Sequence, residues 1–178
     1  IFNEMMKRIE KEIIAPTFEA LSGEGMPFGG ILYPSLMLTK NGPKIIEFNA
    51  RFGDPEAQVY MRLLDSDFLE IINACVNKKL KEIEIKWKNE FACNIALASG
   101  GYPGTYEKGK IISGIEEAEK NPGVVVFHAG TKIVRQDLTT NGGRVLGVSA
   151  IGENLEQSLA TAYDAVLKIN FEGMQYRK

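Results

Sequence analysis

The chain has 178 residues, of which 44% are apolar and 25% are charged, and its net charge is −2. This profile is typical of a globular protein, and the length fits one domain, or one small domain with part of another. Lysine and arginine are scattered among acidic residues without the basic stripe of a nucleic-acid-binding protein. No apolar run approaches the roughly 20 residues that cross a membrane. We therefore expect neither nucleic acid nor a membrane as a partner.

The first part of the chain predicts a helix followed by a β-hairpin. Apolar residues at helical spacing predict an amphipathic helix over residues 1 to about 14, which Pro16 should bend or end. Residues 30–39 predict a strand that is buried on both faces. After a glycine-proline turn, residues 44–50 return as the partner strand of a hairpin.

Two shorter helical patterns follow the hairpin. One runs from Pro55 through Leu64. The other begins at Asp67, where Glu70 three residues later completes a capping pair. The charged stretch 78–90 then predicts a linker, so we place one domain before it and another after it.

Short strands separated by glycine-rich turns dominate the rest of the chain. The expected strands cover residues 91–98, 110–113, 123–129, 131–135 and 144–150. Asn141–Gly143 predicts a tight hairpin turn, and Asn154 with Gln157 predicts the capped start of a last helix. We expect an α+β chain in which residues 1–77 form the first domain. Residues 91–178 form a small mixed β-sheet domain with a packing C-terminal helix.

Glu47 and Asn49 are the first candidates for a functional site. Residues two apart on a strand point to the same side, so these two share a face while Phe48 points into the core. A carboxylate and an amide oxygen are hard ligands that suit Mg²⁺. The alternative is an edge strand that carries two solvated polar residues.

The residues that follow add charged groups to the same region. Arg51 can hold a phosphate or carboxylate at two points, and Gly53 permits a sharp turn. Asp54 and Glu56 then bring carboxylates back toward the region of Glu47 and Asn49. The alternative is a salt-bridged turn in which Pro55 starts a helix, with Asp54 as the helix cap rather than a ligand.

The segment Glu47–Gln58 resembles the phosphoribosylamine–glycine ligase family, also called glycinamide ribonucleotide synthetases, within the ATP-grasp superfamily. Further resemblances occur in the same order along the chain, at Gly30–Pro34, Leu38–Pro43, Ala98–Gly104, Phe127–Thr131 and Asn141–Val148. The resemblance implies that residues 1–77 are the tail of an ATP-grasp core. It also implies that residues 91–178 are the carboxy-terminal domain of this family.

The same resemblance implies a reaction and its ligands. The family activates glycine with ATP as glycyl phosphate, and phosphoribosylamine displaces the phosphate to give glycinamide ribonucleotide, ADP and phosphate. Glu47 and Asn49 match the ligands of Mg²⁺, or Mn²⁺, at the ATP site. Arg51, Asp54 and Glu56 become the catalytic candidates. The strand before Glu47 carries no acidic residue, so the sequence does not decide whether the site holds one metal ion or two.

Two glycine-rich segments supply candidate substrate contacts in the second half. The N–H groups of Gly100 and Gly101 can face an anion, and the Tyr102 ring can flank a ribose. By composition alone, the segment Gly100–Gly104 is simply a glycine-proline loop. Arg144 follows a glycine turn, where it can bind the 5′-phosphate of phosphoribosylamine or form a surface ion pair.

The chain opens at Ile1 within a helical pattern, with neither an initiator methionine nor a signal-peptide pattern. We therefore expect a portion of a longer ligase, with the N-terminal lobes of the same enzyme as its partner and no activity of its own. The alternatives are a non-catalytic ligand- or partner-binding module derived from that enzyme, and another ATP-grasp ligase such as a carboxylase subunit. Two isolated cysteines, Cys75 and Cys93, suit a cytoplasmic location.

Overall fold

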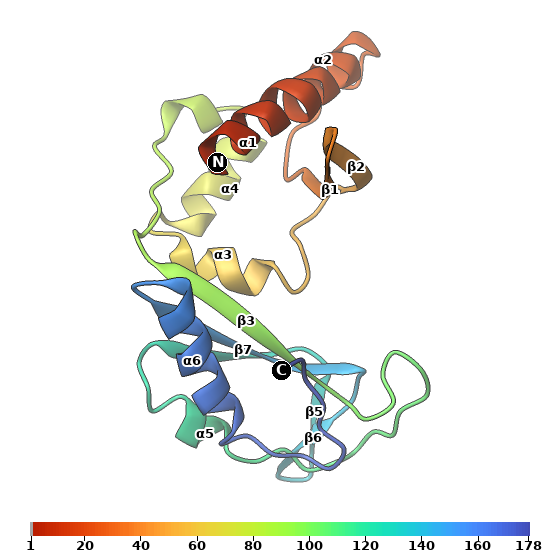
Figure 1. Cartoon of the computed structure of the whole chain (residues 1–178), viewed down its shortest axis with the longest axis vertical. Helices are drawn as coiled ribbons and strands as arrows, with labels where there is room; N and C mark the ends of the chain where they lie inside the picture. The colour runs from red at the N-terminus through yellow and green to blue at the C-terminus, as the bar shows by residue number, and fades with distance from the viewer. Residues whose placement is uncertain (1) are drawn as a thin grey trace. The chain divides into compact units, whose positions relative to one another are not determined.

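The computed structural model describes residues 2–178, which form two compact units (Figure 1). The first unit comprises the chain up to Gly53 together with Ser66–Ile85, and the second comprises Asp54–Asp65 together with Lys86–Lys178. Helices and small sheets occur in both, which confirms the α+β fold class. The domains predicted at residues 1–77 and 91–178 are continuous segments of sequence, whereas each compact unit combines two separate segments. The domain boundaries therefore remain a prediction.

The first unit begins with a helix that does not end at Pro16. Helix α1 (Phe2–Ile9) passes through a π-helical turn (Glu10–Ile14) into α2 (Ala15–Gly23). The N–H of Ala15 donates to the carbonyl of Glu10, five residues back. Pro16 then lies in the first turn of α2. The expectation that Pro16 ends the helix is therefore wrong, because a missing N–H is tolerated at that position.

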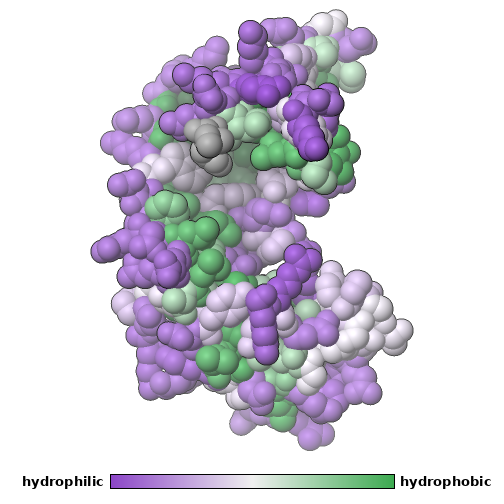
Figure 2. Space-filling view, viewed as in Figure 1, coloured by the Kyte–Doolittle hydropathy of each residue, from purple (hydrophilic) through white to green (hydrophobic). Residues whose placement is uncertain are grey.

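The predicted hairpin is present as β1 (Tyr33–Thr39) and β2 (Gly42–Asn49), which pair antiparallel. Its strands are not buried on both faces as the apolar sequence predicted. Leu38 and Ile46 are 61% and 63% exposed, and Phe48 is 41% exposed instead of lying in a core. Figure 2 shows hydrophobic residues at the surface over this hairpin. The reason is that this sheet has two strands, which cannot cover their own faces.

The other helix of this unit starts where its capping pair predicted. Helix α4 (Phe68–Val76) is preceded by Asp67, whose carboxylate accepts a hydrogen bond of 3.0 Å from the N–H of Glu70. A short 3₁₀ turn (Leu80–Glu82) follows. No helix in the described residues is both long and apolar enough to span a membrane.

A three-stranded antiparallel sheet forms the centre of the second unit. Its strands are β3 (Phe91–Ala98), β7 (Arg144–Gly152) and β4 (Val124–His128), in the order β3-β7-β4. Helix α6 (Leu155–Val166) packs against β3 and β7, and α3 (Ala57–Leu63) also contacts both strands (Figure 1). The predicted cap of α6 is confirmed, since Asn154 Oδ1 accepts from the N–H of Gln157 at 2.8 Å.

The connections of this unit differ from the sequence prediction. The segment 110–113 forms isolated bridges rather than a strand, and a short helix α5 (Ile115–Ala118) follows it. Strand β5 (Thr131–Val134) pairs with an unpredicted strand β6 (Asp137–Thr140). Asn141–Gly143 therefore joins two strands that do not pair, so the prediction of a hairpin turn there is wrong. The actual turn contains Arg135, whose φ of 58° is unusual outside glycine and concealed the turn.

Candidate functional site

Glu47 and Asn49 lie near the end of β2, in the first unit. In the hairpin register they are opposite Ser35 and Tyr33. Asn49 Nδ2 donates a hydrogen bond of 2.9 Å to Glu47 Oε1, so both side chains lie on one face of the strand, as predicted. Rotation of the Asn49 amide would place its oxygen beside the carboxylate. This pair fits a Mg²⁺ ion that takes its other ligands from phosphate and water.

The pair does not amount to a complete metal site. Within residues 2–178 no group of three or more histidine, cysteine, aspartate or glutamate side chains could hold a metal ion. The two side chains can supply only part of the coordination that Mg²⁺ requires. An ion here would take its remaining ligands from outside this pair, such as water or the phosphate of a ligand.

Arg51 continues this edge of the first unit. Its side chain is exposed, and Nη1 donates a hydrogen bond of 2.8 Å to the carbonyl of the next residue, Phe52. The Phe52 ring packs edge-on against Phe68 at 5.4 Å between centroids, which anchors the turn. The remaining guanidinium donors of Arg51 can reach a ligand phosphate.

Asp54 and Arg144, which are 90 residues apart in sequence, form an ion pair in the second unit. Arg144 Nη2 donates to Asp54 Oδ2 at 2.7 Å, and Nη1 donates to the Asp54 carbonyl at 2.9 Å. The interpretation of Asp54 as a helix cap is wrong, because Glu56 directly precedes α3 and no side chain caps that helix. The reason is that α3 begins at Ala57 rather than Pro55. Glu56 itself is exposed.

The loop after β3 places Tyr102 next to Arg144. A Cβ atom at Gly143 would overlap the Tyr102 ring, so the ring lies against the backbone that leads into Arg144. Gly101 has a φ of +95°, and a Cβ there would overlap the carbonyl of Thr105. The loop thus requires glycine at this position. The N–H groups of Gly100 and Gly101 donate no hydrogen bond within the described residues, which leaves them available to an anion.

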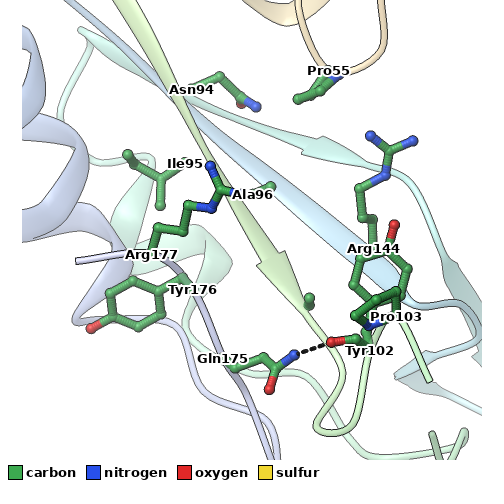
Figure 3. Close-up of a pocket in the computed structure, with 11 residues that line it drawn as sticks. Pro55, Asn94, Ile95, Ala96, Tyr102, Pro103, Arg144, Gln175, Tyr176 and Arg177 are labelled. Atoms are coloured by element: carbon green, nitrogen blue, oxygen red, sulfur yellow. Dashed lines mark hydrogen bonds between the residues drawn. The ribbon is translucent and has the colours of Figure 1, made fainter. Parts of the chain in front are cut away.

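Tyr102 and Arg144, but not Gly100 or Gly101, are among the residues that line a pocket of about 720 Å³ in the second unit (Figure 3). Its lining includes Tyr102 and Arg144, two of the predicted substrate-binding residues, and Pro55 beside Asp54. The volume is in the range of small-molecule sites. The pocket is also lined by Asn94 and the C-terminal segment Gln175–Arg177, which no sequence pattern indicated.

The interface between α3 and the sheet holds polar atoms without partners. Both polar side-chain atoms of Asn94 are buried with no hydrogen-bond partner, as are Gln58 Oε1 and Arg62 Nε. Burial lowers the pKa of the Arg62 guanidinium, although the charge of Glu90 partly opposes this. Buried unpaired polar groups are costly and rare in native proteins, and they often mark functional positions.

Two family models match the chain in sequence order. The ATP-grasp (A) domain of phosphoribosylglycinamide synthetase matches residues 1–57, and the C domain of the same enzyme matches residues 92–178. The chain belongs to the phosphoribosylglycinamide synthetase family. Glu47 and Asn49 lie in the part of the chain that the first model matches, and Arg144 lies in the part that the second model matches.

Known members of the synthetase family match along the whole chain. The phosphoribosylamine–glycine ligase of Caldanaerobacter subterraneus subsp. tengcongensis is 46% identical over 178 residues, which is 100% of this chain and 42% of the relative. The trifunctional purine biosynthetic protein adenosine-3 of Gallus gallus is 46% identical over 179 residues, 100% of this chain and 18% of that protein. The chain thus spans well under half the length of these relatives.

Solved structures agree with this assignment. The crystal structure of phosphoribosylamine–glycine ligase from Thermotoga maritima superposes with a TM-score of 0.79 at 35% identity, covering 97% of this chain and 42% of that one. N5-carboxyaminoimidazole ribonucleotide synthetase from Thermotoga maritima gives a TM-score of 0.61 at 18% identity, over 92% of this chain and 42% of that one. The second likeness shows the fold alone.

Proposed function

We propose that this chain is the carboxy-terminal portion of a phosphoribosylamine–glycine ligase. That enzyme joins glycine to phosphoribosylamine with ATP and forms glycinamide ribonucleotide, ADP and phosphate through glycyl phosphate. The observation that carries the proposal is the pocket of the second unit, where Tyr102 and Arg144 meet in a chain 46% identical to such ligases. The synthetase family model that matches this part of the chain supports it.

The first unit contributes residues to the ATP site in this proposal. Glu47 and Asn49 bind Mg²⁺, or Mn²⁺, together with the phosphates of ATP, as their shared face allows. The ion supplies positive charge that offsets the charge of the phosphates. Arg51 binds phosphate oxygens and stabilises charge that develops during transfer, with no covalent intermediate on the protein.

The second unit binds the ribosyl substrate in this proposal. Arg144 contacts the 5′-phosphate with the donors that Asp54 leaves free, and Asp54 fixes the plane of its guanidinium. The N–H groups of Gly100 and Gly101 bind a neighbouring anionic oxygen, while Tyr102 flanks the ribose. Glu56 is exposed and can orient the amine of the substrate.

The rest of the ligase is the partner of this chain. The relatives are more than twice as long, so residues 1–77 act as the tail of an ATP-grasp core that the remaining length completes. Residues 91–178 act as its carboxy-terminal domain. This portion alone should have no ligase activity, and ADP release by the purified chain that Glu47→Gln abolishes would contradict that expectation.

The first test is a calorimetric titration of glycinamide ribonucleotide, the stable product, into the chain. Arg144→Ala should weaken binding by roughly tenfold or more, because it removes charge-assisted hydrogen bonds to the phosphate. Lys168→Ala is the control, since it removes one positive charge outside the pocket. Equal affinity of the parent chain and the Arg144→Ala variant, or no binding by the parent chain, would refute the proposal that the second unit holds the substrate.

A further inference from the structure

Arg177 is a second arginine of the pocket, and the sequence analysis assigned it no role. Figure 3 shows its side chain extending from the C-terminal segment across β3 toward Ala96. Its guanidinium takes part in no hydrogen bond or ion pair that the structure gives for the described residues; only its carbonyl is engaged, by the hydroxyl of Tyr163 at 2.9 Å. The pocket therefore contains one cation whose charge is not offset.

Arg144 differs from Arg177 in this respect. Its guanidinium is paired with the carboxylate of Asp54 at 2.7 Å, so the two charges largely cancel. Arg144, Asp54 and Arg177 together leave the pocket with a net positive charge. A phosphate monoester carries between one and two negative charges at neutral pH and complements this arrangement.

The C-terminal segment is held firmly enough to position Arg177. Gln175 exchanges two backbone hydrogen bonds with Ala98, at 2.8 and 2.9 Å. Gln175 Nε2 also donates to the carbonyl of Tyr102 at 2.9 Å, which ties the segment to the opposite wall of the pocket. With the Tyr163 bond, these contacts fix the backbone on both sides of Tyr176. The entropy lost when Arg177 binds a ligand is then largely that of its own side chain.

Small residues of the sheet line the pocket beside Arg177 and leave room for a ligand. Ala96 of β3 lies opposite Gly147 of β7, and the side-chain amide of Asn94 lies over Gly147. The side chains of Tyr102 and Tyr176 lie on opposite sides of Ala96 (Figure 3). Aromatic walls with a small number of polar groups are typical of sites that bind small organic ligands.

We infer that Arg177 is a second phosphate-binding residue of this pocket and acts with Arg144 on a phosphorylated ribosyl ligand. The ligand class rests on the proposed function, whereas the anion site rests on the geometry of the pocket. Arg177 supplies the charge that is not offset, and Arg144 supplies an oriented guanidinium. Neither residue alone should give full affinity.

The test is calorimetric titration of ribose 5-phosphate into the 178-residue chain, with ribose and inorganic phosphate as separate probes. Arg177→Ala should weaken ribose 5-phosphate binding by roughly tenfold or more, while Arg177→Lys should retain part of it. Lys168→Ala, which removes a charge elsewhere, should stay within about twofold. Equal thermal unfolding midpoints would show that the variants are folded, as expected for an exposed side chain.

Three results would overturn the inference. These are an Arg177→Ala variant that binds ribose 5-phosphate as well as the parent chain, a parent chain that binds ribose equally well, and inorganic phosphate that binds as tightly as the sugar phosphate. A different result would contradict the proposed function while leaving this inference intact. Ribose 5-phosphate binding that depends on Arg177, without any binding of glycinamide ribonucleotide, would keep the anion site and reject the proposal that the second unit holds the ligase substrate.

Discussion

The glycine-rich loop after β3 allows a comparison of two substitutions that differ in one physical variable. Gly101 and Gly109 both have positive φ, +95° and +80°. A Cβ atom at Gly101 would overlap the carbonyl of Thr105, whereas one at Gly109 would meet nothing within 4 Å. Alanine at either position has the cost of a left-handed residue, and only alanine at Gly101 adds a steric conflict with the backbone.

The two costs can be estimated separately. The left-handed conformation costs a residue other than glycine about 1–2 kcal/mol. Forcing extra atoms into occupied space adds about 1–3 kcal/mol. Gly109→Ala should therefore lower the free energy of unfolding by about 1–2 kcal/mol, and Gly101→Ala by roughly 2–5 kcal/mol.

Urea denaturation followed by circular dichroism measures these losses, and titration with glycinamide ribonucleotide measures the effect on the pocket. Gly101→Ala must displace the loop that carries Tyr102, so it should also abolish binding, whereas Gly109→Ala should leave binding near that of the parent chain. Equal losses of stability in the two variants would refute the reasoning, because the overlap with Thr105 would then have no energetic consequence.

Three further predictions concern the second unit. Asn154→Ala should lower the free energy of unfolding by about 1 kcal/mol, because it removes the acceptor for the N–H at the start of α6; an unchanged urea midpoint would contradict this. Asp54→Ala should change the free energy of unfolding by less than about 1 kcal/mol, since both side chains of the pair with Arg144 are partly exposed, and the same assay tests it. Burial raises the pKa of the Cys93 thiol, so the unfolded chain loses that proton first and stability should fall as pH rises above about 8.5. Cys93→Ala should remove this slope in denaturation at several pH values.

Local sequence patterns predicted the elements that are determined by residues close together in sequence. The capping pair at Asp67 and the capped start of the last helix depend on residues close in sequence, and the structure confirms both. Pro16 failed as a helix end because a π-helical turn precedes it, which no simple apolar period indicates. Strand β6 was missed because its turn contains Arg135 rather than glycine.

The candidate site was harder to predict, because tertiary contacts assemble it. The shared face of Glu47 and Asn49 follows from strand geometry alone. The pairing of Asp54 with Arg144 depends on how α3 packs on the sheet, and sequence spacing contains no information about it. The position of Arg177 likewise depends on the C-terminal segment running beside the end of β3.

The division of the chain has a consequence for how the protein can be shortened. The polypeptide passes from one unit to the other three times, after Gly53, Asp65 and Ile85, so a single proteolytic cut at any of these points leaves two covalent links. A polypeptide that started at Phe91 would also lose α3, to whose Gln58 carbonyl the buried Ser149 hydroxyl is bonded at 3.0 Å. The side chains of β3 and β7 that α3 covers in the intact chain would then be exposed to water. Shortened versions should therefore begin upstream of Asp54.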